Sequence, residues 1–145
     1  MISLKIASNI ILALALAAAG YTDFKKHKIY NYITVPAILA GPLLNGIYSG
    51  ANGVKTSLIA MMIVGGICLL IVFLHGFGYG DMKLMMGIAG IMGIWYTLAL
   101  FFISSIITAV WGVYIIYKGN QRSVPLATCM FIGFVCYTIM GFFLT

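Results

Sequence analysis

Long apolar runs separated by short polar segments make up most of this chain. The first run extends from Ile2 to Tyr21 and would be about 30 Å long as a helix, enough to cross the hydrocarbon core of a bilayer. A second run, Asn31 to Tyr48, contains two prolines, which predict a bent helix. The polar loop Ser49 to Lys55 then leads into a third run, Thr56 to Leu74. The first half of the chain therefore predicts three membrane-spanning helices.

The second half is dominated by one long apolar stretch, Met82 to Tyr117, which exceeds the length of a single span. We predict a turn at Gly93 to Tyr96, because aromatic residues of this kind favour the membrane interface. The stretch then divides into a short helix, Met82 to Gly93, of about 18 Å and a full span, Thr97 to Tyr117. A last apolar run, Pro125 to Phe143, completes a predicted bundle of six transmembrane helices with a short fourth helix.

The composition agrees with this pattern and excludes an ordinary soluble protein. Of the 145 residues, 63% are hydrophobic and only 7% are charged, too few to cover a globule with a wetted polar surface. We therefore expect an all-α integral membrane protein in which residues 1–145 form a single membrane-embedded domain. The cysteines lie inside apolar runs and make no C-x-x-C pair, so neither a zinc site nor a disulfide framework is expected.

The positive charges predict how the bundle is oriented. The net charge is +6, and Lys25, Lys26 and Lys28 lie together after the first run. Basic residues favour cytoplasmic loops, so six spans with this loop inside place both termini on the extracytoplasmic side. The loop would face anionic membrane lipids, and nucleic acid is not an expected partner. The alternative is a signal peptide cleaved near Ala17 to Ala19, which would leave the lysines outside, against the charge rule.

The chain contains only two acidic side chains, Asp23 and Asp81, and each lies where an apolar run meets basic residues. A carboxylate at a membrane boundary costs free energy, so we expect both to have a function. In the predicted topology they lie at the same, cytoplasmic, face. Two carboxylates without another activated nucleophile indicate acid/base chemistry on a water molecule. Each also has a structural explanation: Asp23 as a surface residue neutralised by lysines, and Asp81 as a helix N-cap.

The residues near Asp81 suit an enzyme that acts on a peptide. Gly78 and Gly80 precede it, and glycines without a Cβ allow another backbone to approach a catalytic carboxylate closely. Lys83 follows it, with two roles open: orienting Asp81 or contacting lipid headgroups. Asn31 likewise either binds the substrate backbone or caps the second helix.

Several segments resemble the signatures of a known family. Asp23 followed by Ile29 and Asn31, and then the run Gly78 to Lys83 (GYGDMK), look like the signature segments of the type IV prepilin peptidases, the G-x-G-D aspartic proteases of membranes. The run Val124 to Ala127 is similar to the final helix of the small members that serve tight-adherence pili. The segments occur in the family's order, and the resemblance covers nearly the whole chain.

The resemblance implies a prepilin leader peptidase of the cytoplasmic membrane, active at the cytoplasmic face without a metal or cofactor. Its protein substrate would be a prepilin with a basic leader and a hydrophobic helix, cut after a glycine at the membrane boundary. The large bifunctional members carry a cytoplasmic domain with paired cysteines that is linked to N-methylation; this chain has nothing of that kind, so methyltransferase activity is not expected. The resemblance implies Asp23 and Asp81 as catalytic residues, with a site shaped by Gly78, Gly80, Lys83 and Asn31.

Two other classes of function fit the composition. Asp23 and Asp81 would also suit a small proton- or cation-coupled transporter, in which carboxylates bind and release ions. A non-catalytic assembly subunit is a third interpretation. Transport predicts carboxylates near mid-membrane on facing spans, whereas the sequence places both at the cytoplasmic edge. The pattern therefore favours the peptidase.

Overall fold

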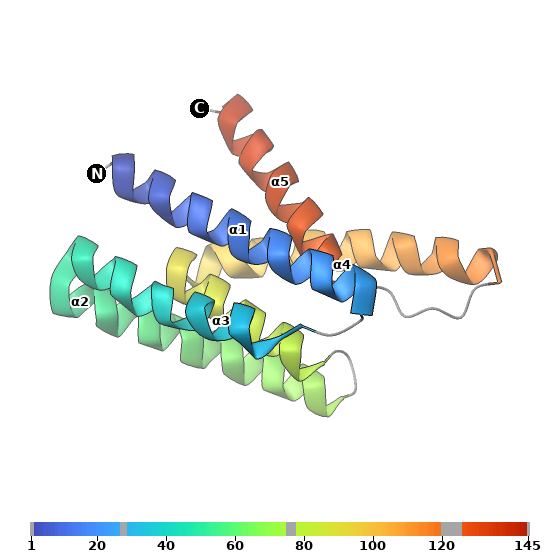
Figure 1. Cartoon of the computed structure of the whole chain (residues 1–145), viewed down its shortest axis with the longest axis horizontal. Coiled ribbons are helices and arrows are strands. Elements are labelled where there is room, and N and C mark those ends of the chain that lie inside the picture. Colours follow the sequence, from blue (N-terminus) through green and yellow to red (C-terminus); the bar gives the residue numbers. More distant parts are fainter. Residues whose placement is uncertain (1, 27–28, 75–77, 120–125, 145) are drawn as a thin grey trace.

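The computed structural model describes residues 2–26, 29–74, 78–119 and 126–144, with side chains described from residue 6 to residue 139 of these ranges. Lys28, Val124 and Pro125 lie outside the described residues. Every regular element in the described ranges is an α-helix, which confirms the predicted all-α fold. The helices, drawn in Figure 1, are α1 (Ile2–Lys26), α2 (Asn31–Phe73), α3 (Tyr79–Met92), α4 (Ile94–Tyr117) and α5 (Leu126–Leu144).

The long helix α2 is a hairpin of two helical legs that lie side by side (Figure 1). Its backbone leaves helical angles at Ser49 (φ −130°, ψ 15°) and Gly50 (φ 59°, ψ −142°), where the chain reverses. Glycine adopts the positive φ of Gly50 without a Cβ clash, so two residues suffice for the turn. The predicted loop from Ser49 to Lys55 is therefore wrong in length. The legs come so close that a Cβ on Gly53 would overlap the carbonyl of Asn45.

The prolines Pro36 and Pro42 lie inside the first leg of α2 without interrupting it. Within α2, which is described in full, non-helical angles occur at Ser49 and Gly50 and not at the prolines. A proline removes one backbone hydrogen bond, but neighbouring helices in a membrane bundle can stabilise the turn that it weakens. The interruption of α2 therefore lies at the hairpin turn and not at the prolines.

Glycines allow α3 to pack closely against the first leg of α2. A Cβ on Gly41 would lie 2.5 Å from the backbone of Gly90, and a Cβ on Gly87 would lie 3.0 Å from the Cβ of Ala37. Small residues at both positions let the helix backbones approach to this distance. The position of α3 relative to α2 is therefore fixed by backbone contact and not by flexible side chains.

Polar side chains from both legs of α2 hold the C-terminal end of α3. The amide of Asn45 and the hydroxyl of Ser57 donate to the carbonyl oxygen of Gly90 at 2.8 Å and 2.7 Å. The last carbonyls of a helix lack intrahelical partners and are costly to leave unpaired in an apolar environment. These two hydrogen bonds supply the missing donors where α3 ends.

A single residue, Gly93, with φ 89°, connects α3 to α4. The turn predicted at Gly93 to Tyr96 is confirmed and is shorter than expected, since α4 begins at Ile94. α3 has 14 residues, which corresponds to about 21 Å. It begins at Tyr79 rather than at Met82, so Asp81 lies within its first turn.

The helices α1 and α5 pack against each other through Gly20 and Thr128. The Thr128 hydroxyl donates to the carbonyl oxygen of Gly20 at 2.9 Å, and a Cβ on Gly20 would already lie 3.4 Å from the Thr128 Cα. α5 also packs against α4. Side chains from α1, α3, α4 and α5 fill the shared core, and the following are at most 1% exposed: Leu12, Leu16, Leu84, Ile88, Leu100 and Met130.

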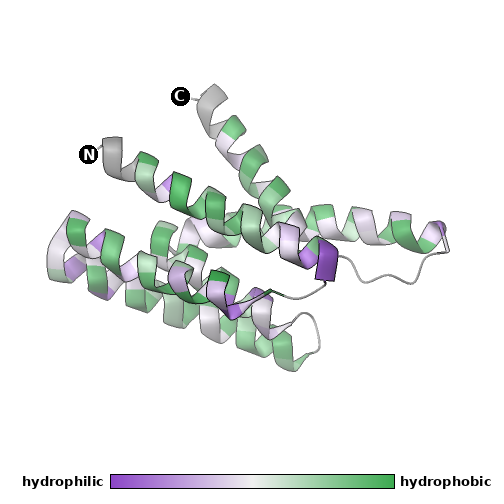
Figure 2. Ribbon diagram, viewed as in Figure 1, coloured by the Kyte–Doolittle hydropathy of each residue, from purple (hydrophilic) through white to green (hydrophobic). Residues whose placement is uncertain are grey.

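The outward faces of the helices are largely apolar (Figure 2). Met62, Ile47 and Leu14 are 76%, 72% and 66% exposed, a surface that lipid covers and water does not. Within the part of the chain that the structure describes, three segments are long and apolar enough to cross a membrane: Ile6–Lys26, Asn31–Phe73 and Ile94–Tyr117. The chain is therefore a helical membrane protein, and the count of six spans remains a prediction.

The contact between α2 and α3 predicts a difference between two glycine substitutions in α2. Gly41→Ala should lower the unfolding temperature of the purified protein in detergent, because overpacking typically costs about 1–3 kcal/mol. Gly66→Ala, where no atom lies within 4 Å of the added Cβ, should leave it unchanged or raise it slightly. Equal unfolding temperatures for the two variants would contradict the close packing of α3.

Candidate active site

Asp23 lies in the last turn of α1 and is buried, with 8% of its surface exposed. Its Oδ2 accepts a hydrogen bond of 2.9 Å from the backbone N–H of Ala127. Ala127 is the second residue of α5, so this N–H is one of those that a helix leaves unpaired at its N-terminus. Asp23 is therefore not the surface residue of the structural alternative but a buried residue that joins α1 to α5.

Asp81 lies in the first turn of α3 and is partly buried. The N-cap of α3 is Gly78, so Asp81 is not the helix N-cap that the sequence left open. Its carboxylate instead accepts a hydrogen bond from the backbone of Gly78. The other oxygen, Oδ1, is buried and has no hydrogen-bond partner among the described residues. A buried carboxylate oxygen without a donor is costly when the group is ionised.

The fold brings the two aspartates to one cavity of about 340 Å³. Asp23 reaches it from the end of α1 and Asp81 from the start of α3, although they are far apart in the sequence. Three of the four predicted site-shaping residues also line it, Asn31 and the two glycines before Asp81, whereas Lys83 is not among the lining residues. The complete lining is Asp23, Ile29, Tyr30, Asn31, Gly78, Gly80 and Asp81.

The two carboxyl groups interact electrostatically. Asp81 lies at the start of α3, which is not one of the three helices long and apolar enough to span a membrane. Burial raises the pKa of Asp81 from its ordinary value of 3.8 to about 7, and the nearby charge of Asp23 contributes to the rise, while the hydrogen bond from Gly78 opposes it. The pair therefore holds a proton under conditions in which an exposed aspartate would be ionised.

Asn31 lines the cavity, and Lys83, which does not line it, contacts Asn31. The Lys83 ammonium donates to the Asn31 side-chain oxygen at 3.0 Å, which joins α3 to the start of α2. The N-cap of α2 is Tyr30 and makes no side-chain capping bond, so Asn31 is the first helical residue and not the cap. The sequence left two roles open for Lys83, orienting Asp81 or contacting lipid headgroups. The hydrogen bond to Asn31 is a third contact that neither role predicts.

Gly80 fits closely against the segment that precedes α2. A Cβ on Gly80 would lie 3.1 Å from the Cβ of Ile29, whereas a Cβ on Gly78 would lie 3.6 Å from Asp81 Oδ2. The absent side chain at Gly80 therefore lets the wall of the cavity close, and Gly78 leaves room beside the carboxylate.

Sequence reasoning did not identify Tyr30 or the backbone N–H of Ala127 as part of the site. Tyr30 lines the cavity as the residue before α2, and its ring also lies 5.5 Å from the Lys26 ammonium. Ala127 was noted only as part of a motif. A backbone donor carries no signature in the side chain, so only the packing of α5 against α1 reveals it.

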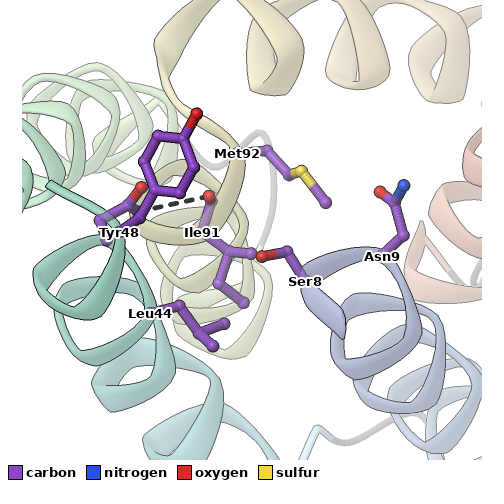
Figure 3. A pocket seen from close by; sticks show the side chains of 7 residues that line it. Ser8, Asn9, Leu44, Tyr48, Ile91 and Met92 are labelled. Carbon is purple, nitrogen blue, oxygen red and sulfur yellow. Dashed lines mark hydrogen bonds between the residues drawn. The ribbon is translucent and has the colours of Figure 1, made fainter. Parts of the chain in front are cut away.

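A second cavity, of about 280 Å³, lies between α1, α2 and α3 (Figure 3). Ser8 and Asn9 of α1 face Leu44 and Tyr48 of α2 across it, and Ile91 comes from the end of α3. Its lining residues carry no carboxyl, histidine or amino group. Of these two cavities, the one with both aspartates is therefore the candidate active site.

The fold and this cavity define a helical membrane protein with a pair of interacting carboxyl groups. A family model described as the type IV leader peptidase family matches residues 10–113, which include both aspartates. The chain belongs to this family, and membership implies a protease that acts on a protein substrate. Comparisons with curated proteins and with solved structures give no match.

The raised pKa of Asp81 predicts how stability depends on pH. The fold resists ionisation of Asp81, so the free energy of unfolding should fall as the pH rises from about 4 through 7. Asp81→Asn cannot ionise, so its unfolding temperature should match that of the wild type near pH 4 and exceed it by roughly 2–5 °C at pH 8. Thermal unfolding in detergent measures both. Lys118→Gln is the control, and a difference for Asp81→Asn that does not change with pH would contradict the prediction.

Proposed function

We propose that the protein is an aspartic prepilin leader peptidase in which Asp23 and Asp81 form the catalytic pair. The observation that carries this proposal is that the only two acidic side chains of the chain line the same cavity. Independent structural roles would not require residues from α1 and α3 to meet. Membership of the leader peptidase family supports the proposal by supplying the class of reaction.

Paired carboxyl groups can hydrolyse a peptide bond when they share one proton. The ionised group takes a proton from a water molecule, and the resulting hydroxide attacks the carbonyl carbon of the scissile bond. The protonated group donates toward the carbonyl oxygen and, as the tetrahedral intermediate collapses, a proton reaches the leaving amine. The cavity beside Asp23 and Asp81 has the volume to hold a water molecule together with a short extended peptide.

The proposed substrate is a prepilin whose basic leader lies in the cytoplasm and whose hydrophobic helix lies in the bilayer. In Figure 1 the last turn of α1 and the first turn of α3 lie at the same end of the bundle, so the carboxylates are near helix ends and not at mid-helix. Lys25 and Lys26 lie at this end as well. The positive-inside rule places it in the cytoplasm, at the cell membrane.

A transporter is the less favoured alternative. Ion-coupled transport uses carboxylates near mid-membrane that open alternately to the two sides. Asp23 and Asp81 instead lie at helix ends, and the second cavity, elsewhere between α1 and α2, has no ionisable group of this kind. Family membership also supports proteolysis over transport.

Removing either carboxyl group should abolish cleavage of a co-expressed prepilin. General acid and base groups each contribute about 10²–10⁴-fold to a rate, so Asp23→Asn and Asp81→Asn should each slow leader removal by at least about 100-fold. Immunoblotting of the precursor and the shortened pilin measures this. Lys118→Gln, which also removes one charge but lies at the end of α4, should process normally. Normal processing by either aspartate variant in correctly inserted protein would refute the pair.

Closing the cavity at Gly80 should slow the reaction without removing a catalytic group. In Gly80→Ala the added Cβ would lie 3.1 Å from Ile29, so the cavity wall must shift. We expect the cleavage rate to fall by about tenfold, or ~1.4 kcal/mol in the barrier. Gly66→Ala, with open space around its Cβ, is the matched control. An unchanged rate in Gly80→Ala would show that this wall does not contact the substrate.

A further inference from the structure

The two carboxyl groups of the cavity have different hydrogen-bond surroundings. Asp23 Oδ2 accepts the N–H of Ala127, which belongs to the first turn of the 19-residue helix α5. A helix N-terminus favours an anion through its unpaired N–H groups and its dipole. The donor is fixed to the backbone of α5, and Ala127 itself is completely buried.

The surroundings of Asp81 stabilise its ionised form less than those of Asp23 do. It also lies at a helix N-terminus and accepts a hydrogen bond from the Gly78 backbone, but its Oδ1 is buried without a donor among the described residues. Protonation removes the cost of that unpaired oxygen and turns the carboxyl group into a donor. Burial and the proximity of Asp23 both raise the pKa of Asp81, in agreement with this geometry.

The other charged and titratable groups near the cavity do not reverse this difference. On α3, Lys83 is engaged by the side chain of Asn31. On α1, the ammonium groups of Lys25 and Lys26 lie over the rings of Tyr21 and Tyr30, at 4.9 Å and 5.5 Å from the ring centroids. Tyr30 lines the cavity from the start of α2, and the first turn of α5 carries no acidic residue. His27 and Lys28 lie outside the described residues.

We propose that the two aspartates have fixed and different protonation states, with Asp23 held ionised by the N-terminus of α5 and Asp81 carrying the shared proton. The catalytic roles rest on the proposed peptidase function: in that reaction Asp23 is the general base and Asp81 is the general acid. The N–H of Ala127 is then a positioning group that acts through Asp23. α5 lies beyond the residues matched by the family model, so this role is assigned by the packing of α5 alone.

Infrared spectroscopy can test the assignment without any cleavage assay. A protonated carboxyl group has a carbonyl stretch distinct from that of a carboxylate, and the chain has only two acidic side chains besides its C-terminus, which is the same in every variant. At about pH 6 we expect a protonated-carboxyl band in the wild type and its loss in Asp81→Asn. Asp23→Asn should keep a band at pH 5, with a titration midpoint lower than in the wild type, because the repulsion is gone. A band that persists in Asp81→Asn and disappears in Asp23→Asn would overturn the proposal.

A pair of proline substitutions tests the role of α5. Ala127→Pro removes the N–H that contacts Asp23, whereas Leu126→Pro places proline one residue earlier in the same first turn and keeps that N–H. Ala127→Pro should let Asp23 become protonated as well, so the band at pH 6 should grow up to about twofold. Leu126→Pro should leave the band unchanged. Identical bands in the two folded variants would overturn the role of α5.

The outcomes separate this proposal from the proposed function. If Ala127→Pro does not fold, as judged by its unfolding temperature and elution in detergent, the comparison of Asp23→Asn with Asp81→Asn still decides which residue holds the proton. In a folded Ala127→Pro variant, the acid limb of the cleavage pH profile should move to higher pH, which a merely structural defect would not cause. The expected infrared bands in a protein that cleaves no prepilin would support the protonation states and refute the peptidase.

Discussion

Asp23 and Asp81 repel each other when both carboxyl groups are ionised in the cavity that they share. Two like unit charges about 4 Å apart near a protein surface repel by about 4 kcal/mol, a large part of the 5–15 kcal/mol that typically stabilises a fold. A chain that brings Asp23 and Asp81 into one cavity must therefore either keep one of them protonated or offset the repulsion between two ionised groups with other packing interactions. The raised pKa of Asp81 indicates the first solution. A shared proton is also what acid/base hydrolysis requires.

Rigid contacts between α2 and α3 oppose this repulsion. α3 carries Asp81, and its opposite end is held by Asn45 and Ser57 from the two legs of α2. The backbone contact between Gly41 and Gly90 prevents α3 from sliding away from α2. A bundle that relied on long, flexible side chains at these positions would relax by separating the carboxyl groups. Backbone packing keeps them together, and burial, with a contribution from the charge of Asp23, raises the pKa of Asp81.

Much of the fold could be predicted from the sequence because a membrane imposes length and hydropathy on each helix. The apolar runs gave the helices to within a few residues, and the aromatic-rich turn at Gly93 was found from composition alone. The loop predicted from Ser49 to Lys55 lies at the right place but is too long, because hydropathy cannot distinguish a polar loop from a helical leg that carries polar residues. The six-span count and the orientation are predictions from the bias of positive charge along the chain.

The candidate site was predictable to the extent that it depends on rare side chains. A chain with two acidic residues points to Asp23 and Asp81 directly, and the glycines beside Asp81 follow from the need for close approach. What escaped prediction is the part of the site made of backbone and of packing: the N–H of Ala127, the unpaired oxygen of Asp81 and the bond between Lys83 and Asn31. These depend on how helices distant in sequence meet, which periodicity and composition do not encode.

The contact between α5 and Asp23 links the end of the chain to chemistry near its beginning. In water, a carboxylate is stabilised wherever it is exposed, and no particular helix is needed. In the buried interior of a helical membrane protein, hydrogen-bond donors are few, and the unpaired N–H groups of a helix N-terminus are among those that packing can supply without burying another charge. α5 delivers one to Asp23, and the Thr128 bond to Gly20 keeps the two helices in register for it. The helix α5 contributes no acidic side chain to the cavity. It nevertheless determines which of the two carboxyl groups in the cavity bears the negative charge.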